Sequence, residues 1–149
     1  MKKTLILMLL TFTTAFASAA EEAGADITVF KSPTCGCCTQ WASHLRENGF
    51  TVNEKKVDNV GAYKQQLGVP GYLSSCHTAM VGGYVIEGHV PASDIRRLLQ
   101  EKPDIRGLTV PGMVAGSPGM EQGGRRDSFN VLAIRKDGSS YIYNSYDKR

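Results

Sequence analysis

Between residues 26 and 57 the apolar positions predict a strand, a helix and a second strand. Residues 26–30 form a short β-rich run, and Pro33 with its polar neighbours ends it. The apolar positions that follow repeat at helical spacing, at Cys38, Trp41 and Leu45. Asn48-Gly49 is a helix stop signal, and residues 50–57 alternate as the second strand. The helix therefore opens on the segment that contains three of the four cysteines.

A second helix and a hairpin follow. The helix ends near Gly68, and its apolar positions are Val60, Tyr63 and Leu67. Residues 77–81 and 84–87 are two β-like runs, and Gly82-Gly83 between them suits a two-residue hairpin turn. The hairpin therefore begins beside the fourth cysteine.

The last part of the chain changes in character. Residues 91–102 predict a third helix with Ser93 as its N-cap. Residues 107–127 are rich in glycine and proline, have little periodicity and predict a loop. Residues 128–149 predict an appended β-hairpin that packs on the same domain, with Asp-Gly at its turn.

The predicted order of elements in residues 21–106 is βαβαββα. This order, with a Cys-x-x-Cys at the start of the first helix, resembles the thioredoxin and glutaredoxin fold. We therefore expect an α/β protein with a thioredoxin-like core, in which the first two strands are parallel neighbours.

The first 20 residues read as a cleaved export signal, with two lysines, an apolar stretch and small residues at the end. Cleavage after Ala19 or Ala20 satisfies the small-residue rule, and we favour Ala20. The formal charge then falls from +3 to +1, because the segment contains two lysines and no acid. This balance does not favour a nucleic-acid partner. The remaining ~130 residues can bury one core without disulfide staples.

The cluster Cys35-Gly36-Cys37-Cys38 suits three kinds of chemistry, together with the distant Cys76. In a redox site, Cys35 attacks and Cys38 resolves, because a helix N-terminus stabilises a thiolate. In a metal site, all four thiolates converge and favour Cu(I), with zinc or an iron–sulfur cluster as alternatives. As structural staples, Cys35–Cys38 and Cys37–Cys76 form two disulfides. The third thiol in one helical turn is more useful to a metal site than to a two-cysteine exchange cycle.

Several other side chains are candidate ligands. Met113 and Met120 lie in the glycine- and proline-rich loop, and exposed thioethers suit copper. His77 follows Cys76 directly, and His89 lies in the loop that leads into the third predicted helix. His44 shares the polar face of the first helix, where we expect it to be solvated. Met80 and Trp41 are expected in the core.

Four motifs in order resemble one family: Cys35-Gly36-Cys37-Cys38, Ser75-Cys76-His77-Thr78, Glu87-Gly88-His89-Val90-Pro91, and Pro111-Gly112-Met113 with the segment to Glu121. They are similar to the CopG-type copper resistance proteins, small exported proteins of Gram-negative bacteria long classed as a domain of unknown function. Val114 stands where we expect a proline in that family. The resemblance implies copper bound through Cys35, Cys37, Cys38 and Cys76.

We therefore expect a periplasmic copper-binding protein for copper resistance that holds Cu(I), with a polynuclear thiolate-bridged cluster as one arrangement. Interconversion of Cu(I) and Cu(II), or transfer of copper to an exporter or chaperone, would follow from the resemblance. Two alternatives stay open. One is a thiol–disulfide oxidoreductase that uses Cys35 and Cys38, and the other is a structural zinc domain.

Overall fold

The computed structural model describes residues 24–148 as a mixed α/β fold built on one sheet. The predicted signal peptide, residues 1–20, lies outside the described residues. Within them, none of the helices combines the length and the apolar character that crossing a bilayer requires.

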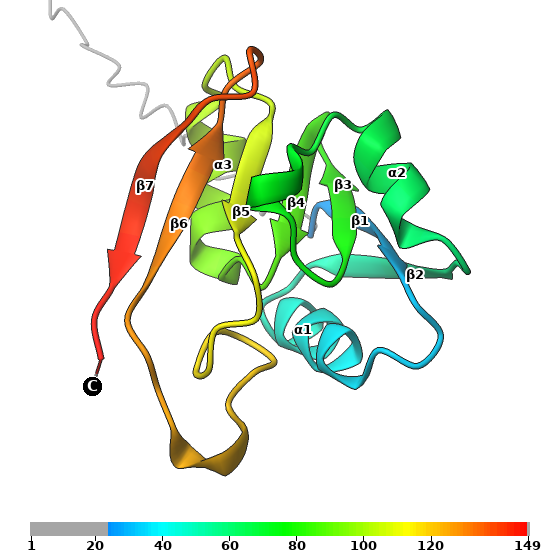
Figure 1. Cartoon of the computed structure of the whole chain (residues 1–149), viewed down its shortest axis with the longest axis vertical. Coiled ribbons are helices and arrows are strands. Elements are labelled where there is room, and N and C mark those ends of the chain that lie inside the picture. The colour runs from blue at the N-terminus through cyan, green and yellow to red at the C-terminus, as the bar shows by residue number, and fades with distance from the viewer. Residues whose placement is uncertain (1–23, 149) are drawn as a thin grey trace, which may run out of the picture.

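Seven strands form the sheet in the order β2-β1-β3-β4-β5-β6-β7 (Figure 1). Their bounds are β1 Asp26–Lys31, β2 Thr51–Lys56, β3 Thr78–Val81, β4 Tyr84–Gly88, β5 Gly107–Val110, β6 Phe129–Ile134 and β7 Ser140–Tyr146. β1 pairs with β2 and β4 pairs with β5 in parallel, and the other neighbours are antiparallel. The parallel first pair is as predicted.

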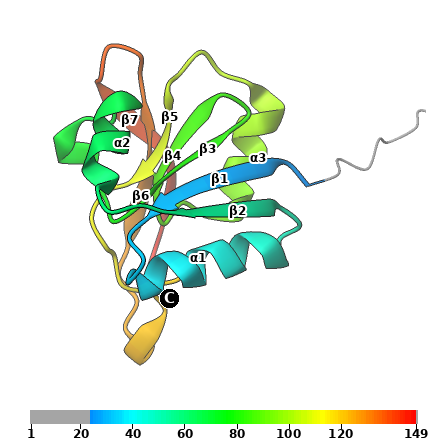
Figure 2. The same ribbon diagram turned by 90° about the vertical axis from the view of Figure 1, so that its right-hand side faces the viewer.

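Three α-helices cover the sheet: α1 Gly36–Glu47, α2 Val60–Gln66 and α3 Ala92–Glu101. Trp41 and Leu45 of α1 and Ile95 of α3 are fully buried in one core with the inward residues of the sheet. α2 packs on the opposite face, where Tyr63 stacks on Phe30 of β1 at 4.3 Å between ring centroids. Figure 2 shows α1 running along β1 and β2. Two short 3-10 turns, Gly71–Leu73 and Gln122–Gly124, complete the chain.

Strand pairing brings four chain segments to one end of the sheet. Phe30 near the end of β1 lies opposite Thr78 at the start of β3, and Thr78 lies opposite Glu87 near the end of β4. Gly88 of β4 pairs in turn with Val110, the last residue of β5. The segments that leave β1, β4 and β5 therefore meet the segment that enters β3. We call this place the cysteine end of the sheet, because all four cysteines lie there.

The predicted order βαβαββα is present, but residues 107–110 correct the prediction of a loop from residue 107 onward. They form β5, a strand buried at every position between β4 and β6. A central strand that is buried on both faces lacks the alternation of apolar and polar residues by which a strand is usually predicted. Because β5 joins β6, the C-terminal hairpin extends the main sheet instead of being appended to it.

His44 and Ser93 also differ from expectation. His44 is half-buried, and its Nε2 accepts a hydrogen bond from the Ala92 backbone N–H at 3.2 Å. Ser93 is not the N-cap of α3, because the helix begins at Ala92 and Pro91 occupies the cap position without a side-chain bond. His44 therefore satisfies one of the free N–H groups that a helix start leaves.

Replacing Gly107 by Ala should destabilise the fold by about 1–3 kcal/mol, because a Cβ there would lie 1.8 Å from the Val85 carbonyl oxygen of the neighbouring strand. Gly71→Ala is the matched control, since nothing lies within 4 Å of its Cβ position. Urea unfolding of the metal-free protein measures both changes. Equal midpoints for the two variants would contradict the β4–β5 contact.

The stability should also depend on pH through His44. Burial lowers the pKa of His44 below its ordinary value of 6.5, although Glu121 and Glu47 favour its charged form. A base with a depressed folded pKa contributes its full stability above about pH 6.5 and loses it as the pH falls through the folded pKa. Between pH 7 and pH 5 the free energy of unfolding should therefore fall more for the wild type than for His44→Gln. Parallel pH profiles would contradict this role.

Candidate metal centre

Three cysteines lie in the first turn of α1. Cys35 is the N-cap in an extended conformation, and its N–H donates to the Ser32 carbonyl at 3.2 Å, which closes the turn after β1. Cys35 and Cys38 form a disulfide across the turn, with their Cα atoms 5.4 Å apart. Cys37 and Cys76 are free thiols. The oxidised structure thus holds one disulfide and two thiols at the same place.

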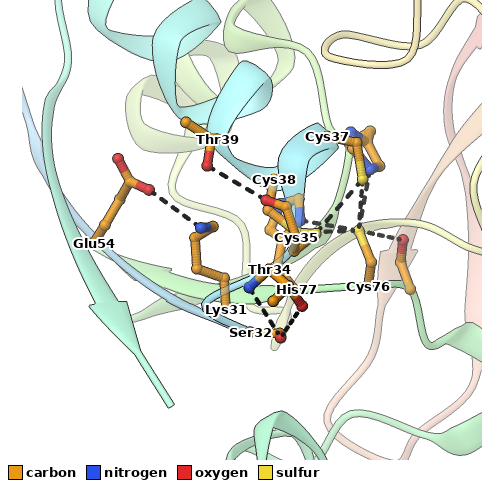
Figure 3. Close-up of a disulfide and its surroundings, with 12 residues drawn as sticks. Lys31, Ser32, Thr34, Cys35, Cys37, Cys38, Thr39, Glu54, Cys76 and His77 are labelled. Carbon is orange, nitrogen blue, oxygen red and sulfur yellow. Dashed lines mark hydrogen bonds and ion pairs between the residues drawn. A yellow bond between two sulfur atoms is a disulfide. The ribbon is translucent and has the colours of Figure 1, made fainter. Parts of the chain in front are cut away.

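Cys76 reaches this turn from the segment that enters β3. Its Sγ lies 3.5 Å from Cys38 Sγ and 3.9 Å from Cys37 Sγ, and Cys37 Sγ lies 3.6 Å from Cys35 Sγ (Figure 3). All four sulfur atoms lie within 4.8 Å of one another. The predicted convergence of the four cysteines is therefore present.

Two histidines border the cluster on the Cys76 side. Cys76 Sγ lies 3.3 Å from His77 Nδ1 and 3.2 Å from His89 Nε2, so these three residues form a second group with donor atoms within 4.8 Å. His89 Nδ1 lies 2.8 Å from the Pro118 carbonyl oxygen. A carbonyl can only accept, so this bond places the proton on Nδ1 and leaves the Nε2 lone pair facing the thiol.

Both imidazoles are kept neutral by their surroundings. Burial is the main cause that lowers the pKa of His89 and lowers the pKa of His77 much further. Burial and then the neighbouring Cys37 raise the pKa of the Cys76 thiol to about 11. A metal ion must therefore displace a proton from Cys76, whereas the histidines need to lose none.

The start of α1 supplies the favourable electrostatics for several sulfurs. The first turn of a helix exposes free N–H groups and carries a partial positive charge, which stabilises thiolates. No acidic residue lies in the first turn of α1. Once the disulfide is reduced, thiolates in this turn would therefore face a favourable dipole without a competing carboxylate from the first turn.

Trp41 is a core residue, as predicted, and it lies against His77 on the inner side of the centre. Its indole is fully buried, lies 4.4 Å from the His77 ring, and donates from Nε1 to the Val90 carbonyl at 2.8 Å. His77 Nε2 is buried and has no hydrogen-bond partner within residues 24–148. The His77 side of the centre is thus buried against the core.

That loop is fastened to the centre at two points. The Gly112 N–H donates to the Ser74 carbonyl at 3.0 Å, and Ser75 Oγ donates to the Gly112 carbonyl. At Gly119, with φ of 84°, a Cβ would lie 2.8 Å from the Cys37 carbonyl oxygen. Figure 1 shows the loop below the sheet beside α1. Met113 and Met120 are therefore each preceded by a glycine that lies against a chain segment containing a cysteine.

The thioethers themselves remain predicted ligands. The Met113 side chain is 61% exposed, and Met120 is half-buried. Met113 thus lies on the solvent side of the loop.

Sequence reasoning missed two ion pairs that each contain a buried charged residue. Glu87 is fully buried on β4 and forms an ion pair with Lys64 of α2 at 2.5 Å. Lys31, the last residue of β1, is also buried, 3.7 Å from Glu54. The available signal was a charged residue, Glu87 or Lys31, next to apolar residues of a predicted strand, since such residues are seldom fully buried unless paired.

Two solved structures are similar to this chain over most of its length. They are named copper resistance protein CopG, form 1 and form 2, and each is 42% identical with a TM-score of 0.79. The match to form 2 covers 83% of this chain and 98% of the form 2 chain. The match to form 1 covers 84% of this chain and 99% of the form 1 chain. The chain belongs to the CopG family.

The predicted resemblance to CopG-type proteins is therefore confirmed. The family described as "Protein of unknown function, DUF411" also matches, over residues 73–120. This range begins just before Cys76 and ends at Met120, so it contains both histidines and both loop methionines of this CopG family member. No curated protein matches the sequence.

The metal-free protein isolated without reductant should show two reactive thiols per chain after denaturation, Cys37 and Cys76. Reduction before the assay should raise the count to four. Peptide mapping of the unreduced sample should recover Cys35 and Cys38 in one linked fragment. A linked Cys37–Cys76 fragment, or four thiols without reduction, would contradict the pairing seen here.

Proposed function

We propose that this protein is an exported copper-binding protein that serves copper resistance in the periplasm of a Gram-negative bacterium. The observation that carries the proposal is the meeting of four sulfur atoms within 4.8 Å. The names of its CopG relatives point in the same direction. The export signal predicted in residues 1–20 supports the compartment.

The donor set favours Cu(I) over other metals. Thiolates are soft ligands that select Cu(I), and neutral imidazole also suits copper. Two soft sulfurs and two neutral imidazoles are present with the disulfide intact, and four sulfurs are present once it is reduced. A cluster in which thiolates bridge several copper ions is one arrangement that we propose for the reduced protein, because four sulfur atoms within 4.8 Å can bridge more than one ion.

We assign Cys35, Cys37, Cys38 and Cys76 as ligands, and His77 and His89 as ligands on the Cys76 side. We propose that Met113 and Met120, in the loop after β5, bind copper transiently. The mixed sulfur and nitrogen set would bind Cu(I) and Cu(II) and so permit a change of oxidation state, and a periplasmic exporter or chaperone would receive the ion. The order βαβαββα with Cys35 and Cys38 at the start of α1 supports a thioredoxin-like core for this site.

The Cys35–Cys38 disulfide favours one second candidate, a thiol–disulfide oxidoreductase. In such an enzyme Cys35 attacks a substrate disulfide, and Cys38 then resolves the mixed disulfide. Cys37 and Cys76 take no part in that cycle. They therefore separate the two functions.

Replacing Cys37 by Ser should lower the Cu(I) affinity of the reduced protein by at least about tenfold and lower the number of copper ions per chain, because a bridging sulfur is lost. Competition with a chromophoric Cu(I) chelator and metal analysis measure both. Thr39→Ala is the control, since Thr39 is an exposed, hard-donor neighbour in the same turn.

An unchanged copper content in Cys37→Ser, with insulin-reducing activity that depends on Cys35 and Cys38, would instead support the oxidoreductase. Binding of zinc in preference to copper by the wild type, with unfolding on chelation, would support a structural zinc domain.

A further inference from the structure

Glu87 is a carboxylate buried behind the metal centre, and the ligands do not account for it. It is fully buried on β4, two residues before His89. One oxygen, Oε1, accepts from Lys64 Nζ at 2.5 Å and from the Ser75 backbone N–H at 2.7 Å. The other, Oε2, is buried without a partner in residues 24–148. The carboxylate therefore joins α2, β4 and the segment that carries Cys76.

Stability alone does not explain this arrangement. Replacing a buried ion pair by apolar side chains of similar size is often neutral or stabilising, because two charges must lose their hydration. A carboxylate oxygen without a partner adds to that cost. The position is also part of the strand whose neighbours Ile86 and Val85 are apolar core residues. A carboxylate retained here points to a specific task.

The contact of Glu87 with the Ser75 backbone N–H indicates what this task is. The segment 74–77 belongs to neither a helix nor a strand, so no ladder fixes its N–H groups. Glu87 Oε1 receives the Ser75 N–H, and Gly88 fits against the same residue, since a Cβ on Gly88 would lie 2.5 Å from Ser75 Oγ. Ser75 is thus held from the side of β4, one residue before Cys76.

We propose that Glu87 is a positioning residue for the metal centre, which fixes the Ser75 backbone and thereby the approach of the Cys76 sulfur to the cysteines of α1. Lys64 holds the carboxylate in place through its hydrogen bond to Oε1. The contact matters because Cys76 Sγ lies only 3.5 Å from Cys38 Sγ, and a small displacement of Ser75 would open the cluster. The effect on copper rests on the proposed function, whereas the effect on the segment does not.

The test compares three variants in the metal-free, reduced protein and in the copper-loaded protein. Glu87→Ala removes the acceptor, and Glu87→Gln keeps an acceptor oxygen but loses the ion pair. Asp94→Ala is the matched control. Asp94 is a buried carboxylate on α3 that accepts from Asn144 at 2.9 Å and Tyr146 at 2.7 Å.

Two quantities are measured: hydrogen exchange of the Ser75 amide by NMR, and Cu(I) affinity by chelator competition. Glu87→Ala should speed Ser75 exchange and lower Cu(I) affinity by about tenfold, which is typical when an outer partner of a metal ligand is removed. Glu87→Gln should show a smaller effect of the same sign, and it carries the test if Glu87→Ala does not fold. Asp94→Ala should lower the thermal midpoint and leave both quantities within twofold of the wild type.

The proposal is overturned if the folded Glu87 variants keep both quantities within twofold of the wild type, or if Asp94→Ala changes them equally. A wild type that binds no copper would refute the proposed function instead. Even then the Ser75 exchange rates decide whether Glu87 holds the Cys76 segment.

Discussion

The metal centre depends on the antiparallel pairing of β1 with β3. With Phe30 opposite Thr78, the turn that leaves β1 and the segment that enters β3 must lie side by side. Three cysteines follow β1 within seven residues, and the fourth precedes β3 by two. A register slip of one residue would turn every side chain of β3 to the other face, so the sulfur cluster and the core specify the same pairing.

The same pairing gathers the outer parts of the site. Because β4 is antiparallel to β3 and β5 is parallel to β4, His89 and the loop after Val110 leave the sheet at the cysteine end. The loop then returns along α1, where its carbonyl at Pro118 fixes the proton of His89. The order of the strands thus brings the candidate ligands together, places the carbonyl that fixes the proton of His89, and brings the loop after β5 to the site. In this order β5, though short, starts the loop at the cysteine end.

The chemistry of the centre is a competition for the same sulfur atoms. A disulfide between Cys35 and Cys38 withdraws two thiolates from metal binding, whereas a bound soft ion protects them from oxidation. The dipole of α1 favours the thiolates of the reduced form, and the neutral histidines add no positive charge that would repel a cation. In the function we propose, an oxidising compartment and a copper ion would therefore act on one site in opposite directions.

The sequence by itself determined the local elements and the identity of the soft donors. The spacing of apolar residues and the turn residues predicted α1, the β3–β4 hairpin and the final hairpin, because these signals depend only on neighbouring residues. The motifs around Cys35, Cys76 and His89 indicated the family before any contact was known. The tertiary structure decided what depends on distant partners: that residues 107–110 pair as a central strand, that His44 caps α3, and that Glu87 holds Ser75. Each of these is a contact between residues at least 12 positions apart, and no local pattern encodes which distant group a buried polar atom will meet.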